Sequence, residues 1–301
     1  MKSLTYDVNE FKRQLNSKDI SLENYKIEDT VNFLQLAKKY NLDLVKINPK
    51  IVKKPDNSIF YLRGTCETDA AKEANDIIVS KLRTIKLNLS LNDYKFNCSE
   101  NQPDSLDSML EYIDKNIILI QYPVAENDSE FHSFYLWHED IPKPVIFINT
   151  NEYVDNQYFY LAHELYHHFY KDGDEKKADK YAAQLLIPDW MLMHFDSSNP
   201  LLSIIEIQKT SRMSYKAIVK ALYNRNKISK DLYDELMEIN PREKSGKYFE
   251  LIADEYDRLN YKKNVNSVSN FIVDIILDNF KKNKISKTYL LESYYELFGE
   301  K

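Results

Sequence analysis

The sequence predicts an α+β fold that is mainly helical, with a small β-sheet packed on a helix that carries two histidines and a glutamate. Apolar residues recur with helical spacing in several segments, and short β-branched and aromatic runs cluster between residues 117 and 148. A His-Glu-Leu-Tyr-His segment follows at residues 163–167. With 301 residues, 43% of them hydrophobic and 29% charged, the chain is long enough for two or three domains with a buried core.

Residues 1–104 are predicted to form an N-terminal domain of unknown role. Its expected elements are helices at residues 30–40 and 70–87 and a strand pair at residues 43–47 and 59–63. The polar stretch at residues 92–104 is the expected boundary before the next domain. No catalytic motif occurs in this part of the sequence.

Three strands are expected in the second predicted domain, residues 105–198. The runs are short, β-branched or aromatic, and bounded by Pro and Asn: Ile117–Ile120, Phe134–Trp137 and Val145–Ile148. An exposed edge at the last run could align a substrate backbone by strand addition. A buried central strand would have the same sequence pattern, so both alternatives stay open.

The two histidines of the motif are spaced for binding one metal ion. Because residues four apart share one face of a helix, His163 and His167 can present two imidazoles to a tetrahedral zinc ion. Glu164 would then lie beside the metal as the general base that deprotonates a water molecule acidified by the metal. His168 lies off this face, and we assign it a solvent or packing role. The pattern therefore predicts a zinc hydrolase site.

A short turn sequence, residues 171–174, separates this helix from a second predicted helix, so the two should run antiparallel. Counting outward from the turn, His167 and Glu175 lie nearest to it and should face each other. His163 and Asp179 form the next pair, one turn further away. We therefore expect Glu175 to be the third metal ligand. Asp179 is expected to accept a hydrogen bond from the other ring nitrogen of His163, which would fix its tautomer.

The chain resembles the ImmA/IrrE family of zinc metallopeptidases from about residue 106 to residue 240. Three blocks carry the resemblance: Ile146-Phe147-Ile148-Asn149, Leu161 to Phe169, and Glu175 to Pro188. It implies a gluzincin site in which Glu175 is the third zinc ligand and Glu164 the catalytic base. It also implies a protein substrate, because many members cleave helix-turn-helix repressors of mobile elements or stress genes. The stretch between His167 and Glu175 is shorter than is usual in the family.

Helices are also expected after the zinc domain. Residues 199–240 should contain three short helices, at residues 201–208, 214–224 and 229–239, with Ser214 and Ser229 as N-cap residues. By the same resemblance they form a helix-turn-helix-like unit. The C-terminal region, residues 241–301, shows helical apolar stripes at residues 271–276 and 290–298. These stripes serve packing, or alternatively an interaction such as dimerisation.

A run of seven basic residues without any acidic residue occurs in an acidic chain of net charge −6: Lys209, Arg212, Lys216, Lys220, Arg225, Lys227 and Lys230. One interpretation is a solvated helix face, and the other is docking to an acidic partner or to DNA. Of the two docking partners we favour a protein. The net charge argues against the whole surface binding nucleic acid.

Composition excludes several classes of site. The four glycines cannot assemble a phosphate-binding loop or a dinucleotide fingerprint. Cys66 and Cys98 form no C-x-x-C pair, which is typical of reduced thiols in a cytoplasmic protein. No apolar stretch reaches the length of a membrane span, and the first residues lack the hydrophobic region of a secretory signal.

The sequence thus predicts a cytoplasmic zinc endopeptidase whose substrate, by resemblance, is a transcriptional repressor. One alternative is a non-proteolytic module that keeps the metal as a structural or sensing centre, and another is a DNA-binding regulator. The residue that stabilises the tetrahedral oxyanion stays open among His132, His138, Tyr153 and Tyr160. The oligomeric state is also left open by the sequence.

Overall fold

The computed structural model describes residues 5–7, 52–53, 59–64, 69–91, 101–124, 131–137, 143–243, 246–251, 262 and 265–298. The expected helix at 30–40, the expected strand at 43–47, His138 and both cysteines lie outside these residues. Packing divides the chain into two compact units. Unit 1 comprises residues 1–100, 110–149 and 264–301, and unit 2 comprises residues 101–109 and 150–263. Packing units are not functional domains, so the domain limits suggested by the sequence stay predictions.

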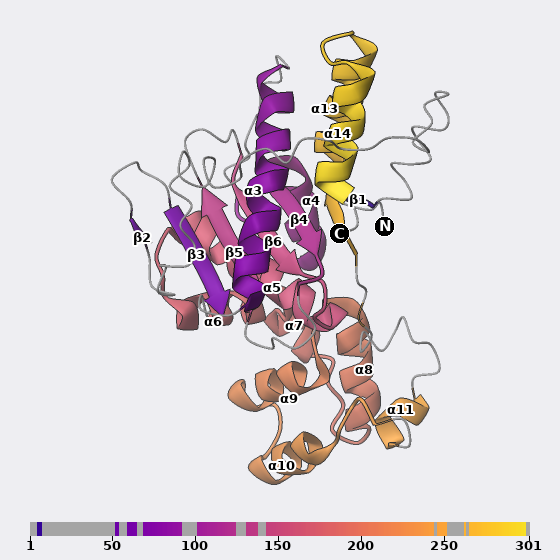
Figure 1. Cartoon of the computed structure of the whole chain (residues 1–301). Coiled ribbons are helices and arrows are strands. Elements are labelled where there is room, and N and C mark those ends of the chain that lie inside the picture. The colour runs from indigo at the N-terminus through magenta and orange to yellow at the C-terminus, as the bar shows by residue number, and fades with distance from the viewer. Residues whose placement is uncertain are drawn as a thin grey trace. The chain divides into compact units, whose positions relative to one another are not determined.

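Unit 1 contains a mixed seven-stranded sheet with the strand order β1-β7-β4-β6-β5-β3-β2 (Figure 1). The strands are β1 (Thr5–Asp7), β2 (Val52–Lys53), β3 (Ile59–Gly64), β4 (Ile118–Tyr122), β5 (Phe131–Trp137), β6 (Val145–Asn149) and β7 (Ser267–Ser269). Strands β4 and β6 are parallel, and the other neighbours are antiparallel. The predicted strands that fall on described residues correspond to β3, β4, β5 and β6, and the α+β fold class is confirmed.

Strand β6 is central in the sheet. It pairs with β4 on one side and with β5 on the other, and all five of its residues are buried. The suggestion that this strand offers an exposed edge to a substrate is therefore wrong, because its backbone groups already bond to two neighbours. At its end, the Asn149 side chain accepts a hydrogen bond from the Val124 N–H (3.1 Å) and donates one to the Phe131 carbonyl (2.9 Å).

Helices from both ends of unit 1 share one core with the sheet. Helix α3 (Asp69–Ser90) packs against α13 (Asn270–Lys281) and α14 (Lys287–Phe298), which also pack on each other. Figure 1 shows α3 lying along the sheet. Ile85 of α3, Phe147 of β6, Ile276 of α13 and Leu290 of α14 belong to one buried cluster. The C-terminal apolar stripes are thus packing surfaces, and the helix expected at residues 70–87 is confirmed.

Helix α4 (Leu106–Asn116) has its first turn in unit 2. The other helices among the described residues of this unit are α5 (Val154–Tyr170), α6 (Glu175–Leu186), α7 (Asp189–Leu192), α8 (Pro200–Ser211), α9 (Tyr215–Asn224), α10 (Lys230–Glu238) and α11 (Lys247–Leu251). Helix α5 packs on α6, and α9 packs on both α8 and α10. The Ser214 hydroxyl accepts a hydrogen bond from the Ala217 N–H, and the Ser229 hydroxyl accepts one from the Leu232 N–H. Three short helices with these N-cap residues are confirmed.

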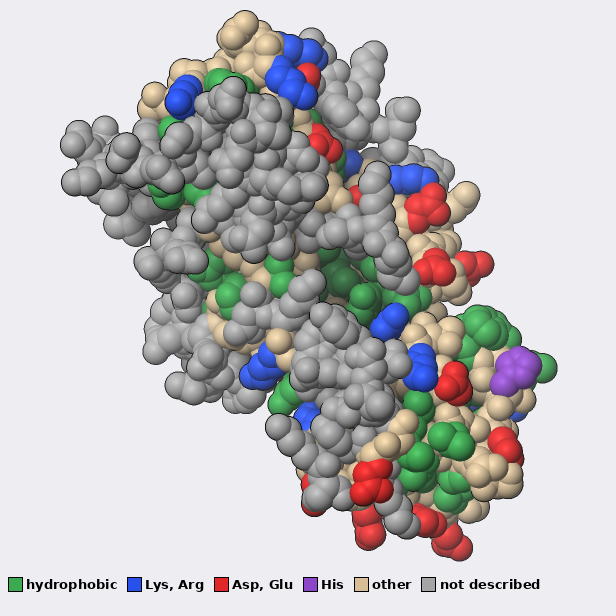
Figure 2. All heavy atoms as spheres, turned by 90° about the vertical axis from the view of Figure 1, so that its right-hand side faces the viewer, with side chains coloured by type: hydrophobic (Ala, Val, Ile, Leu, Met, Phe, Trp, Pro, Cys, Tyr) green, Lys and Arg blue, Asp and Glu red, His purple; other side chains and the backbone are tan. Residues whose placement is uncertain are grey.

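The basic run of α8 to α10 is partly neutralised by acidic residues that lie outside it in the sequence. Ion pairs join Arg225 to Asp189 at 2.8 Å, Lys209 to Glu206 at 3.5 Å, and Lys230 to Asp234. On the face drawn in Figure 2, acidic and basic side chains are interspersed, and hydrophobic side chains also reach the surface.

Among the described residues, no helix combines the length and the hydropathy that crossing a membrane requires.

Candidate metal centre

The candidate site lies where the chain reverses direction between α5 and α6. Helix α5 ends at Tyr170. The C-cap residue Lys171 adopts the left-handed conformation with φ of 52°, and its N–H donates to the His167 carbonyl. Helix α6 begins after Asp174, whose side chain caps the helix by accepting a hydrogen bond from the Lys177 N–H at 3.1 Å. The short connection brings the C-terminal half of α5 beside the first turns of α6, as the turn sequence predicted.

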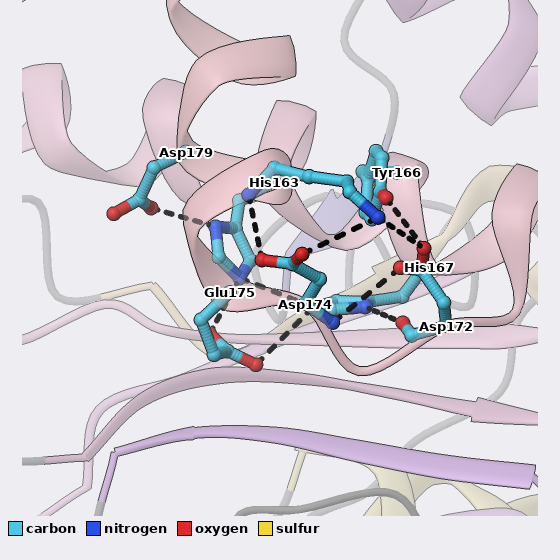
Figure 3. A network of polar contacts seen from close by, with 8 residues as sticks. His163, Tyr166, His167, Asp172, Asp174, Glu175 and Asp179 are labelled. Carbon is cyan, nitrogen blue, oxygen red and sulfur yellow. Dashed lines mark hydrogen bonds and ion pairs between the residues drawn. The ribbon is translucent and has the colours of Figure 1, made fainter.

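Two histidines of α5 and one glutamate of α6 converge in this place (Figure 3). The His163 Nε2 atom lies 3.0 Å from Glu175 Oε2, and the His167 Nε2 atom lies 3.4 Å from Glu175 Oε1. The two Nε2 atoms are 3.2 Å apart. Both imidazoles are buried, with at most 1% of their surface exposed, whereas 38% of the Glu175 side chain is exposed. The group is therefore open to solvent on the glutamate side.

The other nitrogen of each ring has an acceptor that determines its tautomer. The His163 Nδ1 lies 2.9 Å from Asp179 Oδ1, and the His167 Nδ1 lies 2.8 Å from the Asp172 backbone carbonyl. A carbonyl oxygen can only accept, and an ionised carboxylate can only accept, so in each neutral ring the proton belongs on Nδ1. Each Nε2 atom then carries a lone pair. Asp179 is where the sequence predicted it, whereas the Asp172 carbonyl was not predicted.

The donor set fits a divalent metal ion. Two Nε2 lone pairs and a carboxylate are all acceptors, and such atoms repel one another at 3.0–3.4 Å unless a cation lies between them. Tetrahedral zinc with Zn–N distances near 2.0–2.1 Å separates its ligand atoms by about 3.3 Å. The described residues contain this one group of His, Cys, Asp and Glu, namely His163, His167 and Glu175, that could hold a metal ion.

Electrostatics also favour an ionised Glu175. Burial by itself would raise its pKa, but in the metal-free protein the hydrogen bonds and charges of protonated His163 and His167 outweigh burial and lower the pKa to about 2. The carboxylate is therefore charged at neutral pH, as a metal ligand must be.

Glu164, the predicted general base, directly follows His163 on α5 and is fully buried. His168 takes no part in the metal group. Burial, and to a smaller extent Lys171, lower the pKa of His168 to about 3, and its ring packs edge-on against Phe169 at a centroid distance of 4.9 Å. A neutral, packed imidazole agrees with the packing role expected for it.

The described residues do not single out one of the candidates for stabilising the oxyanion. His132 belongs to β5 of unit 1. Tyr153 precedes α5, and its ring is covered by the Arg242 guanidinium at 3.7 Å. Tyr160 of α5 is buried, 7% exposed, with its ring edge-on to its neighbour Phe159. No geometry among the described residues selects one of them, so this role stays unassigned.

Comparisons with known proteins agree with this site. Residues 114–223 match the Peptidase_M78 family, described as the IrrE N-terminal-like domain. Comparison with curated proteins and with solved structures gave no significant match. The matched segment contains both histidines, the intervening glutamate and the carboxylates of α6, and it supports a metallopeptidase-type function. Over residues 114–223 the chain is therefore similar to the IrrE N-terminal-like domain of the ImmA/IrrE family of metallopeptidases.

Proposed function

We propose that this chain is a zinc-dependent endopeptidase of the gluzincin type, acting in the cytoplasm on a helix-turn-helix transcriptional repressor. The observation that carries the catalytic part is the convergence of two imidazole lone pairs and one carboxylate on a single point. The family match supports peptide-bond hydrolysis. The repressor as substrate is supported by the resemblance of the motif blocks to the family.

Zinc is the metal that suits the donor set best. Two imidazole nitrogens and one carboxylate oxygen leave a fourth tetrahedral position open, as in catalytic zinc sites. When bound, the ion would lower the pKa of a water molecule and polarise the carbonyl of the peptide bond to be cleaved. His163, His167 and Glu175 would hold it there.

The chain's own residues supply the proton transfers. Glu164 would accept the proton of the attacking water and deliver it to the amine that leaves, the role of a general base that becomes a general acid. Glu164 directly follows His163 on α5 and is fully buried, which supports a role inside the site. Asp179 holds the His163 ring in the tautomer that keeps Nε2 free for the metal.

The test combines metal analysis with cleavage. Elemental analysis of the purified protein should find about one zinc ion per chain, His167→Ala should lose it, and Glu164→Gln should keep it. Incubated with candidate repressors, the zinc-loaded parent should produce defined fragments, whereas Glu164→Gln should be slower by a factor of about 100 or more.

Two results would contradict the proposal. A parent protein that holds no zinc after metal loading would remove the metal site. Equal biological activity of the parent and of Glu164→Gln in a cellular assay would instead support a non-proteolytic module that acts by binding a regulator.

A further inference from the structure

The turn between α5 and α6 is held by a tyrosine from within the histidine motif. The Tyr166 hydroxyl donates a hydrogen bond to Asp172 Oδ2 at 2.8 Å. Asp172 Oδ1 accepts from the Asp174 N–H at 3.4 Å, and the Lys177 ammonium lies 3.6 Å from Asp172 Oδ2. Figure 3 shows Tyr166 and Asp172 on the far side of His167 from Asp179. The Asp172 side chain is thus fixed from α5 and from α6.

The same residue supports His167 through its backbone. The Asp172 carbonyl accepts the hydrogen bond of His167 Nδ1 at 2.8 Å, and the His167 carbonyl accepts from the Lys171 N–H at 3.1 Å. The ring of His167 therefore depends on the conformation of a four-residue turn. That turn begins with a non-glycine residue in the left-handed conformation, which is unfavourable for a residue with a Cβ atom and must be maintained by other contacts.

Tyr166 is itself held firmly. It is 5% exposed, and its ring stacks on Tyr170 at a centroid distance of 4.6 Å and packs against Tyr181 of α6 at 5.9 Å. The hydroxyl is therefore held in the position from which it donates to Asp172.

We propose that Tyr166 and Asp172 are positioning residues for the metal site. Their contact holds the Asp172 carbonyl on His167 Nδ1, so that His167 presents the lone pair of Nε2 to the metal ion. The inference rests on the proposed function, because it assigns the two residues to zinc affinity and not to fold stability. Outer partners of histidine ligands typically change metal affinity by 10–100-fold when they are removed.

The experiment compares three variants with a matched control in the full-length chain. Tyr166→Phe removes only the hydroxyl, and Asp172→Ala removes its acceptor. Asp172→Asn keeps an oxygen that can accept the same hydrogen bond. The control is Tyr170→Phe, because the Tyr170 hydroxyl donates instead to Gln102 at 3.3 Å, away from the turn.

Zinc affinity is measured by competition with a chromophoric chelator, and the cobalt-substituted protein is followed by its visible absorption spectrum. Tyr166→Phe and Asp172→Ala should bind zinc about tenfold more weakly or worse and change the cobalt spectrum. Tyr170→Phe and Asp172→Asn should stay close to the parent in both. In the metal-free proteins, ¹⁵N shifts of the imidazoles should show His167 protonated on Nδ1 in the parent and as a mixture of tautomers in Tyr166→Phe.

The outcomes separate this inference from the proposed function. Parent-like affinity, spectrum and tautomer in Tyr166→Phe would overturn the positioning role while leaving the zinc site intact. A lower unfolding temperature with unchanged zinc affinity would assign the contact to stability and overturn the inference as well. If the parent itself binds no zinc, the proposed function fails, and the tautomer of His167 still decides what the contact does.

Discussion

At the scale of single residues, some contacts of the metal group could be predicted from the sequence and others could not. The spacing of His163, His167 and Glu175 indicated one common point, and the structure places their side chains there. The Asp179 carboxylate was also foreseeable, since it lies one helical turn beyond Glu175. The contact between His167 Nδ1 and the Asp172 carbonyl could not be predicted, because every residue has a backbone carbonyl. The one available signal was a tyrosine inside the motif, followed by an aspartate six residues later.

Asp155, in the first turn of α5, is a further residue that only the structure reveals. It is 1% exposed, its Oδ2 atom has no hydrogen-bond partner among the described residues, and the Arg242 guanidinium lies 3.9 Å from Oδ1. Burial raises the pKa of Asp155 to about 6, although Arg242 acts in the opposite direction.

Asp155→Asn should remove a pH dependence of stability. Because the folded pKa of Asp155 is raised, the folded state binds the proton more tightly than the unfolded state from about pH 4 to about pH 6. The free energy of unfolding of the parent should fall by about 3 kcal/mol as the pH rises through this interval, and this part of the fall should be absent in Asp155→Asn. Urea unfolding of the metal-free proteins at several pH values measures it. Parallel curves would show that burial does not control this carboxyl group.

At the scale of helices, the N-terminal starts of α9 and α10 could be predicted directly from the sequence, because a serine before a helix accepts a hydrogen bond from a backbone N–H of the first turn. The basic run at residues 209–230 shows that sequence neighbours alone do not determine the local charge. The sequence contains no acidic residue between Lys209 and Lys230, yet Asp189 pairs with Arg225 from another helix. The local positive charge is therefore smaller than the sequence suggested.

Ser214→Ala should lower the free energy of unfolding by about 1 kcal/mol, because the Ala217 N–H loses the hydroxyl that accepts its hydrogen bond. Ser214→Asp, which also caps helices well, should keep most of the stability. Chemical denaturation of the three proteins is the measurement. Equal losses for Ala and Asp would show that the serine acts through packing and not as a cap.

The double variant Lys216→Glu/Lys220→Glu tests what remains of the basic face. Both lysines are exposed on α9, and three of the other basic residues are already paired with acids. We expect the parent to show no saturable DNA binding in fluorescence anisotropy at low salt, and the variant to cleave its protein substrate as the parent does. Salt-dependent DNA binding lost in the variant would support a nucleic-acid role, and loss of cleavage alone would support docking of an acidic partner.

At the scale of the whole chain, the sheet and its covering helices join distant parts of the sequence. Strand β7, residues 267–269, pairs with β4 and also with β1 near the N-terminus. Phe147 of β6 stacks on Phe134 of β5 at 5.2 Å within a core that α13 and α14 complete. Unit 1 is therefore built from segments that lie far apart in the sequence.

Leu290→Ala in α14 should lower the free energy of unfolding by about 2–5 kcal/mol, because the side chain is fully buried in that core. The matched control is Leu87→Ala in α3, where the leucine is 42% exposed and the change should stay within about 0.5 kcal/mol. Urea unfolding followed by circular dichroism compares them. Similar small effects for both would mean that α14 contributes little to the core.

The sequence by itself determined the helices α3, α5, α6, α8 to α10, α13 and α14, the strands β3 to β6 and the face on which the histidines lie, because periodicity, capping and helix spacing are local properties of the chain. The sequence also predicted the three residues of the metal group, because the turn between α5 and α6 is too short for the two helices to pair in another register. Only the tertiary structure decided that β6 is central, that β7 joins the sheet and that the Asp172 carbonyl supports His167. Each of these features depends on backbone hydrogen bonds. Because nearly all residues carry the same backbone donor and acceptor, such bonds cannot be recognised from the pattern of side chains.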